Sequence, residues 1–209
     1  VVARAYRFGS AQRLAADLYS QEVHFVLELV QNCDDCSFAP EVEPSLVMHL
    51  SATRLEFRSN ELGFETKNVL ALCDVGKSTK EMQAGYIGQK GIGFKSVFKI
   101  TKCPQIHSRN FHFCFRAPRN TTSNEHDSLG YIIPFPLPIP EPWDARSGTV
   151  IVLPLEHLSE SGSDLQDLRQ NLSDIQASLL LFLNKLARIE VHDMSRPTAG
   201  VLAGDNGSG

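Results

Sequence analysis

The chain has no long apolar stretch and no excess of basic residues. No apolar run approaches the ~18–20 residues that a membrane-spanning helix needs, so the sequence predicts none. Lys and Arg number 20 against 24 Asp and Glu, and the formal net charge of -4 leaves no basic surface for nucleic-acid phosphates. The sequence therefore predicts that the partner is neither a membrane nor a nucleic acid.

Cysteines are few, and their spacing indicates no disulfide framework. The chain has five, an odd number, and its first residues lack the pattern of a signal peptide. Cys33 and Cys36 form one Cys-x-x-Cys pair without a second pair at zinc spacing, which favours two small buried residues over a metal or redox site. We expect reduced thiols and an intracellular protein, cytoplasmic or nuclear. The chain also lacks an initiator Met, so we expect a piece of a longer protein.

The most informative segment is the glycine-rich stretch 88–96, Gly-Gln-Lys-Gly-Ile-Gly-Phe-Lys-Ser. Its three glycines leave backbone N–H groups uncovered, and the pattern at 94–100 predicts a helix. Exposed amides at a helix start form an anion site, and phosphate is the usual ligand. Phe94 interrupts the Gly-Lys-Ser end that a P-loop requires, so the stretch does not match a P-loop. It also lacks the third glycine of a Rossmann turn. A plain surface loop is the alternative that glycine alone leaves open.

A second group of polar residues lies on a helix predicted from Gln21 to about Cys36. Glu28, Asn32 and Asp35 are spaced i, i+4 and i+7, within roughly 60° of one another on one face. Asn and Asp oxygens suit Mg²⁺, and a Glu one turn away can activate a water as a general base. A solvated helix face is the alternative for the polar stripe alone. Together with a phosphate loop, the stripe favours a Mg-nucleotide hydrolase.

The rest of the pattern predicts one α+β domain. The predicted strands are 46–50, 55–58, 111–116 with Ile106, 131–133, 149–153 and 189–192, and the predicted helices are 11–19, 21–36, 66–73, 94–100 and 165–186. Early helices and hairpin-like strands favour a layered domain over alternating βαβ units. We place this domain at 1–195 and a flexible tail, or the start of a linker, at 196–209.

These motifs resemble the GHKL ATPases, the group of the ninety-kilodalton heat-shock chaperone, gyrase, MutL-type repair proteins and histidine kinases. The resemblance covers about residues 8–193, and its order and separations agree with the group. The segments that carry it are an N-box at 28–36, a lid-proximal segment at 72–80, a phosphate loop at 88–94 and a late Gly-Thr strand at 147–153. Within the group, residues 60–64 and 179–186 resemble the N-terminal ATP-binding modules of the sacsin and plant NO VEIN type.

The resemblance implies a Bergerat fold, a two-layer α/β sandwich in which helices cover one face of a mixed sheet and ATP binds between the layers under a lid. ATP and Mg²⁺ are the implied ligands, with Glu28 as the general base, Asn32 as the Mg²⁺ ligand, and Asp35 and Thr149 near the adenine. The implied phosphate-binding residues are Lys77, Gly88, Lys90, Gly91, Ile92, Gly93 and Phe94.

The resemblance also implies a function. We expect a slow, Mg-dependent ATPase of the chaperone-like type within a larger protein. A module that holds nucleotide, or nothing, and acts as a scaffold without turnover is the alternative. A histidine kinase is a weaker hypothesis, because it needs a phospho-accepting His on a helix before the domain. We expect a protein client or partner, and a homodimer stays open.

One segment departs from the group, which normally has Asp-x-Gly-x-Gly with the Asp accepting a hydrogen bond from the adenine amino group. The equivalent segment here is 59–64, and its register puts Ser59 or Asn60 in the place of that Asp and Glu61 in the place of a glycine. A neutral oxygen is a weaker acceptor than a carboxylate. The sequence therefore predicts a neutral, weaker acceptor for the adenine.

Overall fold

The computed structural model describes residues 24–74, 92–117, 129–146, 148–155, 163–173 and 183–194. The helices are α2 (His24–Asp34), α3 (Thr66–Cys73), α5 (Ile92–Lys95) and α7 (Ser163–Ser173), with 3-10 helices η1 (Ser96–Lys99) and η2 (Leu129–Tyr131). The strands are β1 (Ser45–Leu50), β2 (Arg54–Ser59), β3 (Gln105–Ser108), β4 (Phe111–Cys114), β5 (Phe135–Pro136), β6 (Thr149–Pro154) and β7 (Arg188–Asp193). Predictions for 11–19, 196–209, Lys77, Gly88, Lys90 and Gly91 lie outside the described residues.

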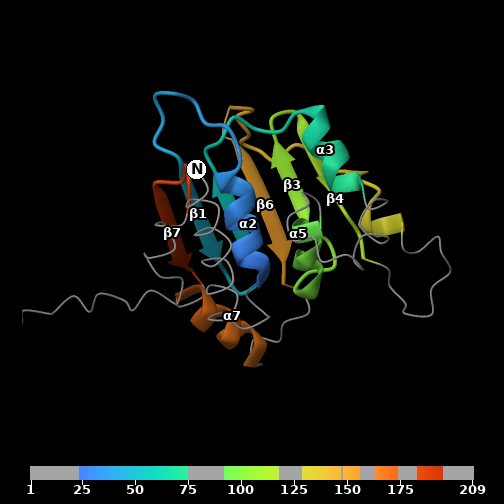
Figure 1. Cartoon of the computed structure of the whole chain (residues 1–209). Helices are drawn as coiled ribbons and strands as arrows, with labels where there is room; N and C mark the ends of the chain where they lie inside the picture. The colour runs from blue at the N-terminus through green and yellow to red at the C-terminus, as the bar shows by residue number, and fades with distance from the viewer. Residues whose placement is uncertain are drawn as a thin grey trace, which may run out of the picture.

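The strands form one mixed sheet. Their order is β5-β4-β3-β6-β2-β1-β7, with β1 and β7 parallel and every other neighbouring pair antiparallel. Figure 1 shows α2 and α5 on the same face of this sheet. The α+β class predicted from the sequence is therefore confirmed. Within the described part of the chain, each helix is too short or too polar to cross a bilayer.

The core lies between the sheet and α2. Phe25, Val26, Leu29 and Val30 of α2 are almost fully buried, and so are alternate residues of the inner strands, such as Met48. This alternation arises because successive strand residues point to opposite faces of a sheet. The apolar run of β6 is explained by its place between β3 and β2, near the middle of the sheet. Burying these apolar side chains is the main term that stabilises such a layer.

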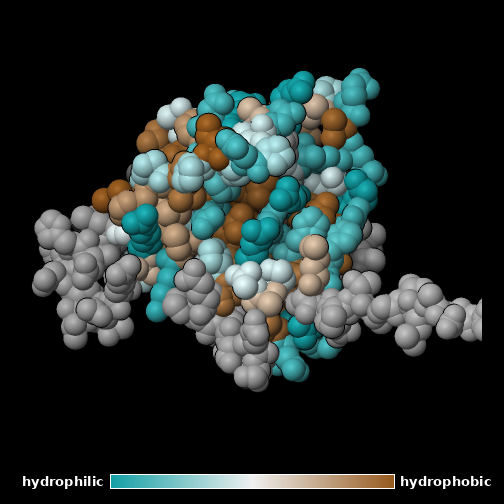
Figure 2. Space-filling model, turned by 180° about the vertical axis from the view of Figure 1, so that it is seen from behind, coloured by the Kyte–Doolittle hydropathy of each residue, from teal (hydrophilic) through white to brown (hydrophobic). Residues whose placement is uncertain are grey.

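The other face of the sheet is largely polar. Figure 2 shows this side of the molecule, where hydrophilic residues surround smaller hydrophobic areas. Arg54 and Arg58 of β2 both form ion pairs with Glu56 from this face, and their side chains remain more than half exposed. A sheet with one buried and one solvated face accounts for the alternating pattern of these strands.

Three predicted elements differ in the structure. The strand predicted at 131–133 is wrong: η2 ends at Tyr131, and the strand that pairs with β4 is β5. Pro136 is tolerated there because β5 is at the sheet edge, where a missing N–H breaks no ladder. The helix predicted at 94–100 is helical but splits into α5 and η1. The helix predicted at 165–186 begins at Ser163, and residues 183–187 are not helical.

Candidate functional site

A pocket lies between the C-terminal half of α2 and the sheet. It encloses about 400 Å³, part of which is open to solvent. Its apolar lining residues are Leu29, Leu46, Phe57, Phe64 and Ile151, and its polar ones are Asn32, Ser59, Glu61 and Thr149. An apolar wall with a few placed polar groups is the usual form of a small-molecule site. Three residues predicted from the sequence, Asn32, Ser59 and Thr149, thus meet in one pocket.

Glu61 supplies a buried carboxylate to this pocket. Its side chain is held at both oxygens: Oε1 accepts a hydrogen bond from the Thr149 hydroxyl, and Oε2 accepts one from the Gly63 amide at 2.7 Å. Only 5% of Glu61 is exposed. The sequence register puts Glu61 in the place of a glycine and predicts a neutral acceptor. The structure instead puts a carboxylate in the pocket wall. The sequence pattern that fits it is an acid two residues before a glycine, and in the structure that glycine, Gly63, has a positive φ.

Buried hydrogen bonds extend from this pair to its neighbours. The Ser108 hydroxyl lies 2.6 Å from the Thr149 hydroxyl and accepts a hydrogen bond from the Phe64 amide at 2.7 Å. On the other side, the Ser59 hydroxyl accepts a hydrogen bond from the Glu61 amide at 3.2 Å. Buried polar groups that are all satisfied fix one geometry. The polar end of the pocket is therefore preorganised.

Cys33 also lines the pocket, as a neutral thiol. Burial raises the pKa of Cys33 to about 12, against a smaller opposing effect of its hydrogen bond to Ser59. Its Sγ donates that bond to the Ser59 hydroxyl at 3.0 Å. A thiol with so high a pKa stays protonated at neutral pH, where the thiol form is a poor nucleophile. Cys33 and Cys36 both contribute to the pocket wall, and the Cys36 thiol donates a hydrogen bond to the Asn32 carbonyl at 3.2 Å.

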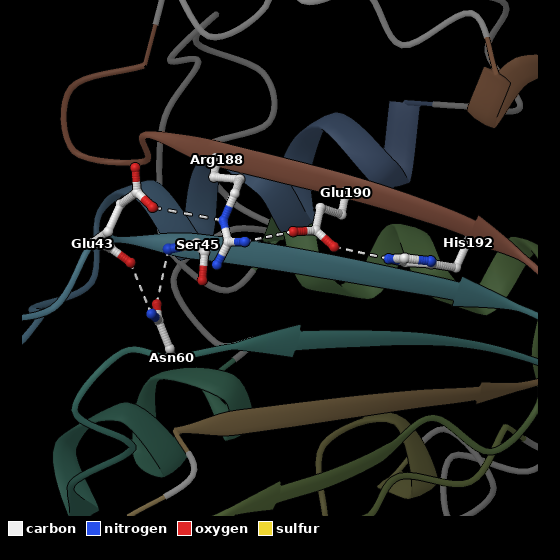
Figure 3. Close-up of polar contacts among 6 residues, drawn as sticks. All are labelled: Glu43, Ser45, Asn60, Arg188, Glu190 and His192. Atoms are coloured by element: carbon white, nitrogen blue, oxygen red, sulfur yellow. Dashed lines mark hydrogen bonds and ion pairs between the residues drawn. The ribbon is translucent and has the colours of Figure 1, made fainter.

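Asn60 has a different role from the one predicted. Its Oδ1 accepts a hydrogen bond from the Ser45 amide and its Nδ2 donates one to the Glu43 carbonyl, both at 2.8 Å (Figure 3). The side chain thereby joins the end of β2 to the start of β1. Both halves of the amide are engaged with backbone, and Asn60 is not part of the pocket wall.

Figure 3 also shows a row of charged side chains along β7, on the sheet face away from α2. The Arg188 guanidinium lies 3.8 Å from Glu43 and 2.7 Å from Glu190, and Glu190 lies 2.9 Å from the His192 ring. These pairs are largely exposed, and such pairs contribute little to stability. They belong to the solvated side of the sheet and not to the pocket.

Glu28 and the glycine-rich segment come together at the contact between α2 and α5. A methyl group built on Gly93 would lie 2.9 Å from the carboxyl carbon of Glu28, so no larger residue fits without moving that carboxylate. Ser96 donates a hydrogen bond to the Gly93 carbonyl at 2.5 Å, which fixes the turn. The Glu28 side chain is about 30% exposed, with the His24 ring 3.9 Å away. Two motifs predicted separately are therefore neighbours, although Glu28 itself is outside the pocket wall.

Other predicted ligand residues are placed elsewhere. Asp35 is exposed and is not in the pocket wall; its carbonyl accepts a hydrogen bond from Lys185 Nζ at 3.0 Å. Phe94 is buried and its ring packs against Phe115, with 6.0 Å between ring centres, so its side chain is core. Ile92 forms the start of α5. In the described ranges, no three His, Cys, Asp or Glu side chains form a group that could hold a metal ion.

The neighbouring carboxylate, Asp34, is the buried one. Its oxygens accept hydrogen bonds from the backbone amides of Asn184, Lys185 and Leu186 at 2.7 to 2.8 Å. Burial disfavours its charge, yet these hydrogen bonds outweigh burial and lower the pKa of Asp34 below its usual value. Asp34 thus fastens the end of α2 to the segment before β7. These contacts also explain why the predicted last helix does not extend through residues 184–186: the backbone amides there donate to Asp34 instead of to helix carbonyls.

Comparison with known proteins places the chain in a family. The family model of the sacsin domain matches residues 15–133. The chain is 41% identical over 198 residues to Protein NO VEIN of Arabidopsis thaliana, which covers 86% of this chain and 7% of that protein. It is 31% identical over 130 residues to Sacsin of Homo sapiens, which covers 53% of this chain and 3% of that protein. The chain thus spans a small part of these relatives. Since the family model matches more than half of its residues, the chain belongs to the sacsin domain family.

Proposed function

We propose that this domain binds ATP with Mg²⁺ in the pocket between α2 and the sheet and hydrolyses it slowly. In this proposal the domain has a Bergerat fold and is a chaperone-like GHKL module of a larger protein. One observation carries the proposal: a buried carboxylate, Glu61, is fixed by Thr149 at the polar end of a pocket whose other walls are apolar. That arrangement suits a flat ligand with an amino group on its edge, because the carboxylate can only accept hydrogen bonds.

Adenine has the matching chemistry. Its exocyclic amino group can donate to Glu61, and the rings of Phe57 and Phe64, with Leu46 and Ile151, offer apolar surface to the base. Guanine carries a carbonyl oxygen at the corresponding position, and that oxygen would face the carboxylate without a proton between them. The pocket therefore favours adenine over guanine, since an unpaired buried polar group is costly.

The groups for the phosphate end come from α2 and α5. Asn32 lines the same pocket and offers an amide oxygen, a ligand type that Mg²⁺ accepts. Bound Mg²⁺ would supply charge neutralisation for the phosphates. Gly93 brings bare backbone next to Glu28, the residue that in this proposal takes a proton from water as a general base. Asn32, Gly93 and Glu28 thus fit a Mg²⁺-bound triphosphate. Asp35, which does not line the pocket, has no role in this proposal.

Binding without turnover is the second candidate. One observation favours it: Glu28 does not line the pocket, and its carboxylate lies against Gly93. Under this reading the domain is a nucleotide-dependent scaffold, and Glu28 stabilises the contact between α2 and α5.

The test is titration of the chain with ATP, ADP and GTP, with and without Mg²⁺, followed by calorimetry and thermal unfolding. We expect ATP to bind more tightly than GTP and to raise the melting temperature, because a ligand of the native state stabilises it. Glu61→Gln should remove most of the preference for ATP, and Glu41→Gln, which changes an exposed carboxylate outside the pocket, should not. No binding at millimolar ATP would contradict the proposal.

Turnover separates the two candidate functions. Loss of a general base typically costs ~10²–10⁴-fold in rate, so Glu28→Ala should bind ATP and lose hydrolysis. Wild-type release of phosphate above the Glu28→Ala background supports the ATPase. Equal rates in the two proteins, with intact ATP binding, support the scaffold.

A further inference from the structure

The turn between β3 and β4 contains an unusual backbone conformation. Arg109 has φ of 51°, and among the described residues it is the one non-glycine with positive φ. A side chain in this left-handed region costs free energy, and such residues persist where surrounding contacts hold them. The neighbours of Arg109 show what holds it.

Arg109 packs directly on the loop that follows β2. Its Nε donates a hydrogen bond to the Leu62 carbonyl at 2.5 Å. A methyl group built on Gly63 would lie 2.6 Å from Arg109 Cγ, so the Arg109 side chain fills the space where residue 63 would carry its own. Gly63 itself has φ of 85°, which only glycine adopts readily. The two residues therefore fit one another in both conformation and space.

This loop carries the pocket carboxylate. The amide of Gly63, the residue beneath Arg109, donates to Glu61 Oε2. The same turn also holds the next residue, since Ser108 accepts a hydrogen bond from the Phe64 amide. On its outer side the turn is fixed by Trp143, whose Nε1 donates to the Arg109 carbonyl at 2.9 Å.

We propose that Arg109 is a positioning residue of the pocket: it holds the Leu62–Gly63 peptide so that Glu61 faces the ligand in a fixed orientation. The effect of Arg109 on nucleotide recognition rests on the proposed function. Its cause is the geometry of the loop: the Leu62 amide is held by the Ser37 carbonyl, and the Leu62 carbonyl is held by Arg109. A loop held in its binding conformation loses less entropy when the ligand binds. Lysine cannot replace this role, because it lacks the guanidinium geometry that places Nε beside a carbonyl.

Arg109→Gly is the sharpest variant. Glycine adopts φ of 51° without strain, so the backbone of the turn is preserved while the side chain is removed. We expect ATP affinity to fall about tenfold, the scale of one lost charge-assisted hydrogen bond, and preference over GTP to fall with it. The ATP affinity of Arg109→Lys should fall nearly as far. Arg146→Gly, which removes an arginine that is 90% exposed, is the matched control for charge and should bind as wild type.

A double-variant cycle distinguishes positioning from a general effect on folding. Because Arg109 acts through Glu61, its removal should cost little affinity in a Glu61→Gln background. An equal loss in both backgrounds, or wild-type affinity in Arg109→Gly, would overturn the proposal. Hydrogen exchange of the Gly63 amide, measured by NMR without nucleotide, separates this inference from the proposed function. We expect at least tenfold faster exchange in Arg109→Gly. If wild type binds no nucleotide, the proposed function fails, and an unchanged Gly63 exchange rate overturns the positioning claim independently.

Discussion

The Thr149 hydroxyl donates a hydrogen bond to the Glu61 carboxylate, and the two residues are 88 positions apart in the chain. Both are buried: Thr149 begins β6, Glu61 lies two residues after the end of β2, and β6 pairs with β2. The register that aligns Ser59 with Thr149 brings the loop after β2 over the start of β6. Sheet pairing thus assembles the polar end of the pocket.

Removing that hydroxyl should destabilise the fold. Thr149→Val keeps the shape of the side chain but leaves a buried carboxylate oxygen without its donor, which should cost about 1–3 kcal/mol of unfolding free energy. Thr149→Ser keeps the hydroxyl and should lose less. Urea unfolding of the two variants and wild type checks this. Equal stability of Thr149→Val and wild type would show that the bond contributes nothing net.

A methyl group at Gly93 should disturb the contact with Glu28. Gly93→Ala places Cβ against the Glu28 carboxyl group, and because this group ends a flexible, about 30% exposed side chain that can turn aside, the cost should stay below about 1 kcal/mol. Glu28→Ala removes the obstructing group, so the double variant should recover most of this loss. Thermal and urea unfolding of the two single variants and the double variant form the test. Additive losses would mean that the strain at Gly93 comes from another neighbour.

Asp34 should stabilise the fold in a pH-dependent way. Asp34→Asn keeps the size of the side chain but weakens bonds to three amides, and should cost about 2–4 kcal/mol at neutral pH. Because its hydrogen bonds lower the folded pKa, this contribution is present above the unfolded pKa of about 3.9 and is lost as pH falls through the folded value. The difference in unfolding free energy between wild type and Asp34→Asn should therefore shrink below about pH 4. Asp35→Asn is the matched control and should be near neutral, since Asp35 is exposed.

Three partly or fully buried histidines on the sheet face away from α2 should make the fold sensitive to mild acid. Burial lowers the pKa values of His49, His107 and His112, and the neighbouring His112 lowers that of His107 further. The unfolded chain then binds protons that the folded chain does not. Stability should be greatest above about pH 6.5 and should fall as pH drops below it.

The pair His107 and His112 offers the direct check, because their Nδ1 atoms lie 3.2 Å apart and share one hydrogen bond. Urea unfolding at pH 7.5 and 5.5 should show a smaller loss for His112→Gln than for wild type. An identical loss in both proteins would place the acid sensitivity elsewhere.

Much of the fold follows from local pattern. The helix at 66–73 and the strands at 46–50, 55–58, 149–153 and 189–192 are found within one or two residues of the predicted bounds. Their apolar periodicity matches the period of the element, and burial of that periodic face decides the structure. The failures at 131–133 and 183–186 are places where a distant partner, β4 or Asp34, determines the backbone.

The site was less accessible to sequence reasoning for the same physical reason. Asp34 and Asp35 are adjacent acids, and helix periodicity selected Asp35 because it continues the face of Glu28 and Asn32. Burial of Asp34 is decided by amides about 150 positions later, which local spacing does not reveal. Likewise, the sequence does not reveal Glu61 as the pocket carboxylate, because its partner Thr149 comes from a strand far along the chain.

The parallel pairing of β7 with β1 has a consequence for how this domain is made. Residues 188–193 complete the sheet edge beside 45–50, and the segment just before them fastens α2 through Asp34. During synthesis, the helix that forms one wall of the pocket is secured only after residues 184–186 have left the ribosome. Closing so long a loop is entropically costly and slow. A nascent chain that stops before residue 184 leaves the buried carboxylate of α2 without these three amide donors, so the α2 wall of the pocket is fastened only once that segment has been made.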